Sequence, residues 1–370
     1  MTRHIILLAP VPPFRGGIAR HSQALARELA GRKGVRVSVE SFARLYPRLL
    51  YPGQGDRDDS LSAPVEYPVR FQLDSINPLR WRACARRVIA ARPDLVVMPA
   101  WTFFVAPVLG WIARRLRKAG IPVVMMVHNA YDHDGGSGKK ALSRWQLAGA
   151  DLFLTHNAQL ANDIADLTAA RRIAIHPHPL FDDYPAPTGR LPREHALELL
   201  FFGLVRPYKG LDIAIEAVAR SELADVRLTV AGEFWQGRAE TDALIARLGL
   251  TNSVEIIDRY VSDAEAAEYF GRADAVLLPY RAATGSGVVA LARHFRRPVV
   301  GSAVPGLAGE VIQRQDGWLF PPGDIDALAS LLRHEVTRSR IAVMTPALED
   351  AARRLSWASF ADALLGLIEE

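Results

Sequence analysis

Short apolar runs recur along this chain, and most are followed by a segment with the period of an amphipathic helix. In the first half the runs occupy residues 4–9, 35–39, 93–98, 121–127, 151–155 and 173–175, with helical patterns at 19–32 and 158–167. A strand that is apolar at nearly every position has both faces buried, which is typical of parallel sheets covered by helices on both sides. The pattern therefore predicts an α/β protein with doubly wound, Rossmann-like sheets.

The alternation stops and restarts at residues 184–192, which have the proline-rich composition of a linker. After it we expect strands at 198–202, 226–231, 254–257, 274–278, 298–301 and 317–320, and helices at 210–220, 238–248, 263–270, 287–295, 307–313 and 324–334. The length of 370 residues suits two domains. We predict domains at 1–185 and 186–345 that face a cleft, and an amphipathic helix at about 346–370 that packs back on the first domain.

Composition excludes several classes of protein. The single cysteine, Cys84, rules out a disulfide framework and a cysteine-built zinc site, which favours a reducing, cytoplasmic compartment. The apolar run near the N-terminus is too short for a signal peptide, and no run of about 18 apolar residues could span a bilayer. We therefore expect a protein that is not integral to a membrane.

Charge is distributed unevenly between the two halves. Residues 1–185 contain 25 Lys and Arg against 15 Asp and Glu, a net charge of +10, which leaves −5 for residues 186–370. A basic cluster at 114–118 ends an apolar helical segment that begins at Trp101, a pattern that suits docking on an anionic membrane surface. A buried helix with an arginine-capped end is an equally good interpretation. Nucleic acid is not expected as a partner, because aromatic residues do not interleave with the basic ones.

A glycine-rich turn follows the apolar run at 275–278 and precedes a helix. Gly285, Ser286 and Gly287 permit a sharp turn there, and the first turn of the helix directs unpaired N–H groups at whatever lies above the strand. Phosphate is the natural ligand of such a site, although any α/β protein needs small residues where a strand turns into a helix.

A second basic loop, at residues 203–210, also lies between an apolar strand and a helix. It begins at Gly203 and contains Arg206 and Lys209. Two anion-binding loops in one domain favour a diphosphate as the ligand.

The order of these motifs resembles one known family over essentially the whole chain. The matching segments are 201–212, 273–280, 285–289, 298–302 and 316–324, together with Gly16-Gly17, His128-Asn129 and residues 176–179 in the first domain. The chain thereby resembles the retaining, nucleotide-sugar-dependent glycosyltransferases of family 4, which have the GT-B fold. The resemblance implies transfer of a sugar from a nucleotide-diphosphate sugar to a hydroxyl of a glycan or lipid-linked acceptor.

The resemblance also implies roles for particular residues. Arg206 and Lys209 bind the donor diphosphate and stabilise the charge that develops on the leaving group, so that neither a metal ion nor a cofactor is needed. His128, directly after a strand, contacts the reacting sugar or acts in catalysis. The donor-binding set comprises Gly16, Gly17, Gly203, Arg206, Lys209, Arg259, Tyr260, Thr284, Gly285, Ser286, Gly287 and Val288. His133 and Asp134 are candidates for the acceptor side. No metal is expected at His176 and His178, because no third ligand has a suitable spacing.

The chain departs from the family pattern at one place. The family typically carries two glutamates around the glycine turn, and Thr284 and Ala292 stand at those positions here, while Glu310 is one residue out of step. This departure favours one alternative, a non-catalytic nucleotide-sugar-binding subunit of a glycan-assembly complex. A GT-B epimerase or phosphorylase is a further alternative, but a phosphorylase would need a pyridoxal-phosphate lysine context that the sequence lacks. Assays of donor hydrolysis and transfer distinguish the non-catalytic subunit from the transferase.

Overall fold

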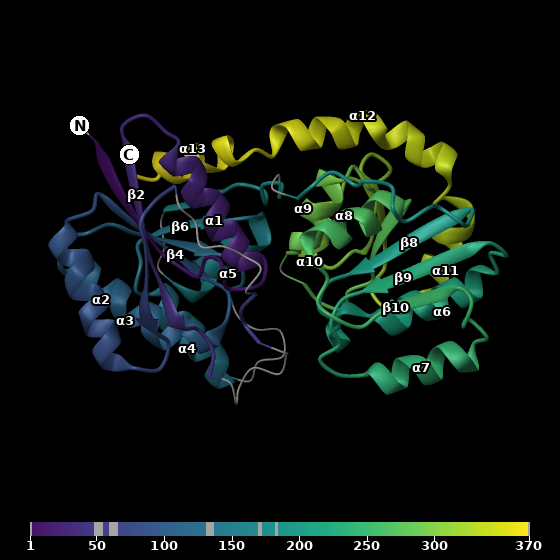
Figure 1. Ribbon diagram of the computed structural model, residues 1–370, viewed down its shortest axis with the longest axis horizontal. Helices are drawn as coiled ribbons and strands as arrows, with labels where there is room; N and C mark the ends of the chain where they lie inside the picture. The colour runs from purple at the N-terminus through teal and green to yellow at the C-terminus, as the bar shows by residue number, and fades with distance from the viewer. Residues whose placement is uncertain are drawn as a thin grey trace. The chain divides into compact units, whose positions relative to one another are not determined.

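The computed structural model describes residues 2–47, 55–58, 66–130, 137–168, 172–181, 184–283 and 285–368. The chain divides into two compact units (Figure 1). Unit 1 comprises Met1–His178 and Ser356–Glu370, and unit 2 comprises Pro179–Leu355. Among the described residues no helix is long and apolar enough to cross a membrane.

Unit 1 is built on a seven-stranded, wholly parallel sheet with the order β3-β2-β1-β4-β5-β6-β7. The strands are β1 (Arg3–Leu8), β2 (Val35–Arg44), β3 (Val69–Asp74), β4 (Leu95–Ala100), β5 (Val123–Val127), β6 (Leu152–Thr155) and β7 (Arg172–Ile175). The helices are α1 (Gly17–Ala30), α2 (Pro78–Ala91), α3 (Ala106–Lys118), α4 (Ser137–Leu147), α5 (Ala158–Leu167) and α13 (Trp357–Gly366), with a short 3₁₀ helix, η2 (Phe103–Val105).

Alternate residues of the central strands enter two separate cores, as expected for strands buried on both faces. Ile6 and Leu8 of β1 belong to a core with α2, α3 and α5, whereas Ile5 and Leu7 belong to a core with α1 and α13. The sequence analysis missed β3. This edge strand carries polar residues between its apolar ones and is only partly buried, so it lacks the continuous apolar run of the inner strands.

Helix α3 settles the choice between the two interpretations of the apolar segment that begins at Trp101. The apolar side chains of α3, including Leu109 and Ile112, are buried in the core of unit 1. At its basic end, Arg114 donates to the carbonyl of Trp145 and stacks 4.1 Å from the centre of that indole ring. The interpretation as a buried helix with a basic end is therefore confirmed.

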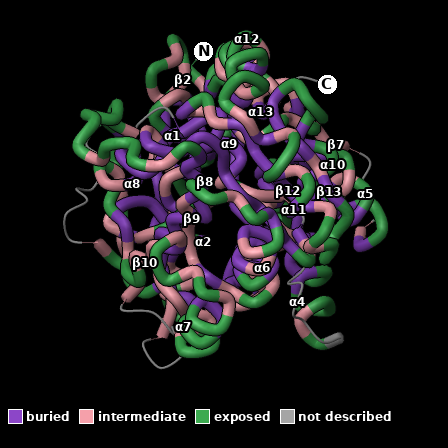
Figure 2. Tube along the Cα trace, turned by 90° about the vertical axis from the view of Figure 1, so that its right-hand side faces the viewer, coloured by how far each residue is buried: buried purple, intermediate pink, exposed green. Residues whose placement is uncertain are grey.

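Unit 2 repeats the same winding in a six-stranded parallel sheet with the order β10-β9-β8-β11-β12-β13. Its strands are β8 (Leu197–Phe202), β9 (Val226–Ala231), β10 (Val254–Ile257), β11 (Ala275–Leu278), β12 (Val299–Ser302) and β13 (Gly317–Phe320). Its helices are η3 (Pro207–Lys209), α6 (Leu211–Ser221), α7 (Arg238–Arg247), α8 (Asp263–Arg272), α9 (Gly287–His294), α10 (Pro305–Ala308), α11 (Ile325–His334) and α12 (Arg338–Arg354). Exposed residues dominate the turns of α7 and α12 (Figure 2).

Two helix predictions in this half are wrong. The expected helix at 346–370 is two helices, because α12 begins at Arg338, runs through Pro346 and ends at Arg354, and Ser356 then caps α13 by accepting from the N–H of Ser359. The expected helix at 307–313 is the four-residue α10. Of the two C-terminal helices, α12 belongs to unit 2 and α13 to unit 1.

Candidate functional site

The two basic, glycine-containing loops of unit 2 meet at the point where the strand order reverses. Strands β8 and β11 are neighbours, although two other strands of the sheet belong to the chain between them. In doubly wound sheets the loops at the carboxyl ends of such strands form the ligand site. The loops also hold each other, because the N–H of Arg281 donates to the carbonyl of Tyr208 at 2.7 Å. The structure thus brings together the loop at 203–210 and the loop that ends at Gly287.

Lys209 lies at the centre of this arrangement. It is only 8% exposed, and its ammonium nitrogen is 3.2 Å from the position that a Cβ atom would take at Gly203. Gly203 has a φ of +93°, a backbone conformation that favours glycine. The absence of a Cβ atom also leaves space for the ammonium group of Lys209. Burial, and to a lesser extent the positive charge of Arg206, lower the pKa of Lys209 to about 7. An anion beside Lys209 would reverse this effect by stabilising the charged form.

Arg206 is held flat against an indole ring. Its guanidinium carbon lies 4.0 Å from the centre of the Trp235 ring, which comes from the loop after β9. The Arg206 Nε is buried and has no hydrogen-bond partner in the described part of the chain. A cation that is positioned by stacking and keeps a donor unused is suited to bind an anionic ligand. The sequence analysis did not single out Trp235, because nothing in its local pattern marks it.

The N-terminus of α9 supplies the backbone donors that the glycine turn predicts. Ser286 is the N-cap, yet its side chain does not cap the helix, and its hydroxyl lies 3.3 Å from that of Tyr280. Gly287 and Val288 form the first turn, and a Cβ atom at Gly203 would lie 3.9 Å from a methyl carbon of Val288. Gly285 directly precedes the cap. Thr284 lies outside the described residues.

Backbone conformation does not require glycine at position 287. Gly287 is the first residue of α9, and its φ is outside the left-handed region. A Cβ atom at this position would meet the ring of Phe181 at 3.7 Å, which is an ordinary contact. At Gly203 and Gly210, in contrast, φ is positive, and the backbone conformation does favour glycine.

A carboxylate does lie at the glycine turn, although positions 284 and 292 carry none. The Glu310 carboxylate is buried and accepts a hydrogen bond from the backbone N–H of Ser286. Burial is the main reason that the pKa of Glu310 is raised to about 7, and the positive charge of Arg293 opposes that rise. Ala292 is fully buried within α9. Glu310 belongs to the segment after α10. Because it stands one residue away from its place in the family pattern, the sequence did not indicate that it reaches the glycine turn.

Arg259 and Tyr260 belong to the segment between β10 and α8. They follow the edge strand β10, which is separated from β8 by β9. The Arg259 guanidinium forms an ion pair with Glu265 at 2.5 Å. Asp258, which precedes Arg259, accepts from the backbone N–H of Phe234 at 2.9 Å, in the loop that carries Trp235.

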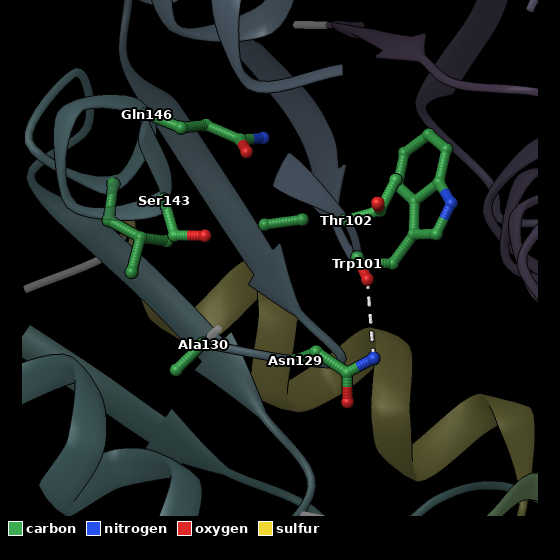
Figure 3. Close-up of a pocket in the computed structure, with 8 residues that line it drawn as sticks. Trp101, Thr102, Asn129, Ala130, Ser143 and Gln146 are labelled. Atoms are coloured by element: carbon green, nitrogen blue, oxygen red, sulfur yellow. Dashed lines mark hydrogen bonds between the residues drawn. The ribbon is translucent and has the colours of Figure 1, made fainter. Parts of the chain in front are cut away.

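In unit 1, Gly16 and Gly17 lie where the loop after β1 becomes helix α1, with Gly16 as the N-cap. His128 directly follows β5, and its backbone N–H donates to the carbonyl of Ala100 at 2.8 Å. Beside these strand ends is a small polar pocket (Figure 3), lined by Ala100, Trp101, Thr102, Asn129, Ala130, Ser143, Gln146 and Leu147. In it the Asn129 amide donates to the carbonyl of Trp101 at 3.2 Å. His133 and Asp134 lie outside the described residues.

His128 is one member of a group of closely packed histidines. The ligand atoms of His21, His128 and His156 all lie within 4.8 Å of one another. Burial lowers the pKa of His128 to about 3, and burial together with the neighbouring imidazoles holds the pKa values of His21 and His156 well below their usual range. The rings are therefore neutral at physiological pH. The sequence analysis missed His21 and His156, which are remote from His128 in the chain and have no spacing that marks them.

Comparisons with known proteins agree with this geometry. Residues 196–336 match the family model described as glycosyl transferases group 1, and residues 16–179 match the one described as a glycosyl transferase 4-like domain. A D-inositol 3-phosphate glycosyltransferase of Stackebrandtia nassauensis is 31% identical, over 95% of this chain and 86% of the relative. A GDP-mannose:glycolipid 4-beta-D-mannosyltransferase of Xanthomonas campestris pv. campestris is 26% identical, over 63% of this chain and 64% of the relative.

Solved structures show the same fold. Sucrose-phosphate synthase from Thermosynechococcus elongatus has a TM-score of 0.77 at 18% identity, covering 99% of this chain and 98% of that one. Anabaena HepE in complex with UDP has a TM-score of 0.72 at 17% identity, covering 100% of this chain and 100% of that one. The two parallel sheets with their helices are those of the GT-B fold.

Proposed function

This chain belongs to the group 1 glycosyl transferases, and on that premise we propose that it moves a sugar from a nucleotide-diphosphate sugar to a hydroxyl of a glycan or lipid-linked acceptor. One observation carries the proposal. A buried lysine, a stacked arginine and the N-terminus of α9 lie on adjoining loops at the switch point of unit 2. Together these groups offer side-chain and backbone donors enough for the two phosphates of a diphosphate.

The arrangement suits a diphosphate leaving group. As the bond between the anomeric carbon and the phosphate oxygen breaks, negative charge grows on the diphosphate, and fixed donors already in place stabilise that charge. We propose that Lys209 and Arg206 act in this way, with the N–H groups of Gly287 and Val288. Glu310, which lies at the glycine turn, would provide the carboxylate that positions 284 and 292 lack.

The relatives support an acceptor rich in hydroxyl groups. The names of the relatives include an inositol phosphate and a glycolipid as acceptors. We propose that the acceptor of this chain belongs to the same broad class of polyols and glycans.

A transfer assay tests the function. We expect release of nucleoside diphosphate from one of the UDP-, GDP-, ADP- or TDP-sugars, with transfer to an inositol phosphate or to a lipid-linked saccharide. We further propose that the anomeric configuration is retained, which proton NMR of the product reports. A product of inverted configuration would contradict the proposed retention but not the proposed sugar transfer. Tight donor binding without transfer or hydrolysis would instead support a non-catalytic subunit.

We predict that transfer needs no hard divalent cation, because we assign to Lys209 and Arg206 the neutralisation of the diphosphate that such an ion would provide. Adding Mg²⁺ or Mn²⁺ to chelator-treated protein should change kcat by less than about twofold. Loss of activity on chelation that Mg²⁺ or Mn²⁺ restores would contradict the proposed diphosphate site.

We predict that His128→Ala lowers kcat by about 10²-fold or more and changes donor affinity by less than about threefold. The reason is that we assign His128 a contact with the reacting sugar, whereas the affinity for the donor comes mainly from the diphosphate. Steady-state kinetics and calorimetric donor binding measure the two effects. An equal loss in both, or an unfolded variant, would show that His128 has a structural role.

We also propose weak attachment to anionic membranes, through α2 rather than α3. Leu79 at the start of α2 is 72% exposed, and Arg80, Arg82 and Arg86 of the same helix are exposed. We expect sedimentation with anionic vesicles that falls as salt rises and is weakened several-fold in Arg82→Glu. Equal binding to neutral vesicles, or no effect of this substitution, would contradict the proposal.

A further inference from the structure

Three histidines from distant parts of unit 1 converge on one buried point. His21 comes from the second turn of α1, His128 from the end of β5 and His156 from the end of β6. His21 is 0% exposed. Burying the polar ring nitrogens of these neutral histidines costs free energy that apolar side chains at the same positions would not cost.

The nitrogens of this cluster are poorly satisfied by the protein itself. Neither ring nitrogen of His21 has a hydrogen-bond partner in the described part of the chain, and the same holds for Nε2 of His128. A neutral imidazole has one N–H donor and one lone pair. The N–H of His21 can face the aromatic rings of Trp357 and Phe360, whose centres lie 4.8 and 5.2 Å away, but its lone pair faces no donor among the described residues.

The spacing fits a transition metal. Nε2 of His156 and Nδ1 of His128 are 3.1 Å apart. Two nitrogens that bind one tetrahedral Zn²⁺ at 2.0–2.1 Å are separated by about 3.3 Å. All three ligand atoms lie within 4.8 Å of one another, so small side-chain rotations would bring them to the distances that one ion requires.

His156 also has the supporting contact that metal-binding histidines usually have. Its Nδ1 lies 3.3 Å from the carbonyl oxygen of His176. Donation to that carbonyl fixes the tautomer and leaves the lone pair of Nε2 facing His128. Around the cluster, Trp357 and Phe360 of α13 provide an apolar wall, which strengthens metal binding by excluding water.

We propose that His21, His128 and His156 bind one divalent transition-metal ion, with Zn²⁺ as the ion of choice for a set of neutral imidazoles. The ion ties α1 to the ends of β5 and β6. Three protein ligands leave a fourth position for water or another group. All three ligands come from unit 1. His128 is also assigned a contact with the reacting sugar, but metal binding is measured without donor or acceptor, so the test does not depend on the transferase function.

Metal content of the full, untagged chain tests this inference. The protein is treated with chelator, exchanged into buffer with Zn²⁺ or Co²⁺, passed through a desalting column and measured by mass spectrometry of the metal. We expect about one ion per chain, a visible spectrum of tetrahedral Co²⁺, and a rise in Tm with Zn²⁺. We expect His21→Phe and His156→Phe to bind at least about 100-fold more weakly.

His334→Ala provides the matched control, because His334 is exposed on α11 and lies outside the cluster. It should bind the metal as the unaltered protein does. If His21→Phe does not fold, as judged by circular dichroism, His156→Phe alone decides. Less than about 0.1 ion per chain in the unaltered protein, or equal binding in the folded histidine variants, would overturn the proposal.

Discussion

Lys209→Met is expected to lower kcat/KM for donor transfer by about 10²–10³-fold, the range found when one preorganised donor to a developing anion is removed. The Lys209 ammonium is buried beside Gly203 and the first turn of α9, so no water can take over its role at low cost. Methionine retains most of the volume and removes the charge. Steady-state kinetics with a saturating acceptor measures the loss.

The fold should survive this substitution. Because the pKa of Lys209 is lowered to about 7 in the folded chain, protonation favours the unfolded state between that value and the usual lysine pKa. At pH 8 the variant should therefore unfold with a free energy equal to or above that of the unaltered protein. Lys33→Met, at an exposed position, is the control and should leave both quantities unchanged. An active Lys209→Met protein would contradict the assigned role.

Gly210→Ala is expected to destabilise unit 2 by at least about 3 kcal/mol, a fall in Tm of roughly 6–12 °C for a unit of this size. Gly210 has a φ of +66°, and a Cβ atom there would lie 2.1 Å from the carbonyl oxygen of Pro279. That oxygen is backbone and cannot rotate away. The loop that carries Lys209 and the loop after β11 must then separate, so donor binding should weaken as well.

Gly237→Ala is a closely matched control. Gly237 also precedes a helix and has a φ of +82°, but a Cβ atom there would meet nothing within 4 Å. This substitution should lower the free energy of unfolding only by the cost of a positive φ at alanine, about 1–2 kcal/mol. Differential scanning calorimetry compares the two variants. Equal losses of stability would show that the close approach of Pro279 to Gly210 is not what holds the loops together.

Much of the fold could be predicted because strands that are buried on both faces give nearly continuous apolar runs in the sequence. In β8, Leu199 and Phe201 enter one core and Leu200 between them enters another, so these consecutive positions are all apolar. The end of the chain was harder. A proline at position 346 favours a helix start, but Thr337 caps α12 nine residues earlier and the helix accommodates the proline.

The diphosphate loops could be predicted because their chemistry is local. Gly203, Arg206 and Lys209 share one loop, and sheet order alone brings the loop after β11 beside it. Contacts across the fold could not be predicted. Trp235 reaches Arg206 from the loop after β9, and Glu310 reaches the N–H of Ser286 from beyond β12.

The histidine cluster shows the same limit more sharply. His21, His128 and His156 are separated by 107 and 28 positions along the chain, and they meet because β5 and β6 are neighbours beneath α1. Metal-site motifs rely on short spacings within one or two elements. Where each ligand comes from a different element, only the assembled sheet reveals the set.

Proton uptake on donor binding tests the central claim most directly, namely that a sugar-linked diphosphate binds at Lys209. Calorimetric titrations at pH 8 with the active nucleotide-sugar, in buffers of different ionisation enthalpy, measure how many protons the complex takes up. Since the pKa of Lys209 is about 7 without ligand, the diphosphate should drive protonation and give an uptake approaching one proton per chain. In Lys209→Met the uptake should vanish and the affinity should fall about 30-fold or more. Equal uptake and equal affinity in the two proteins would contradict the claim.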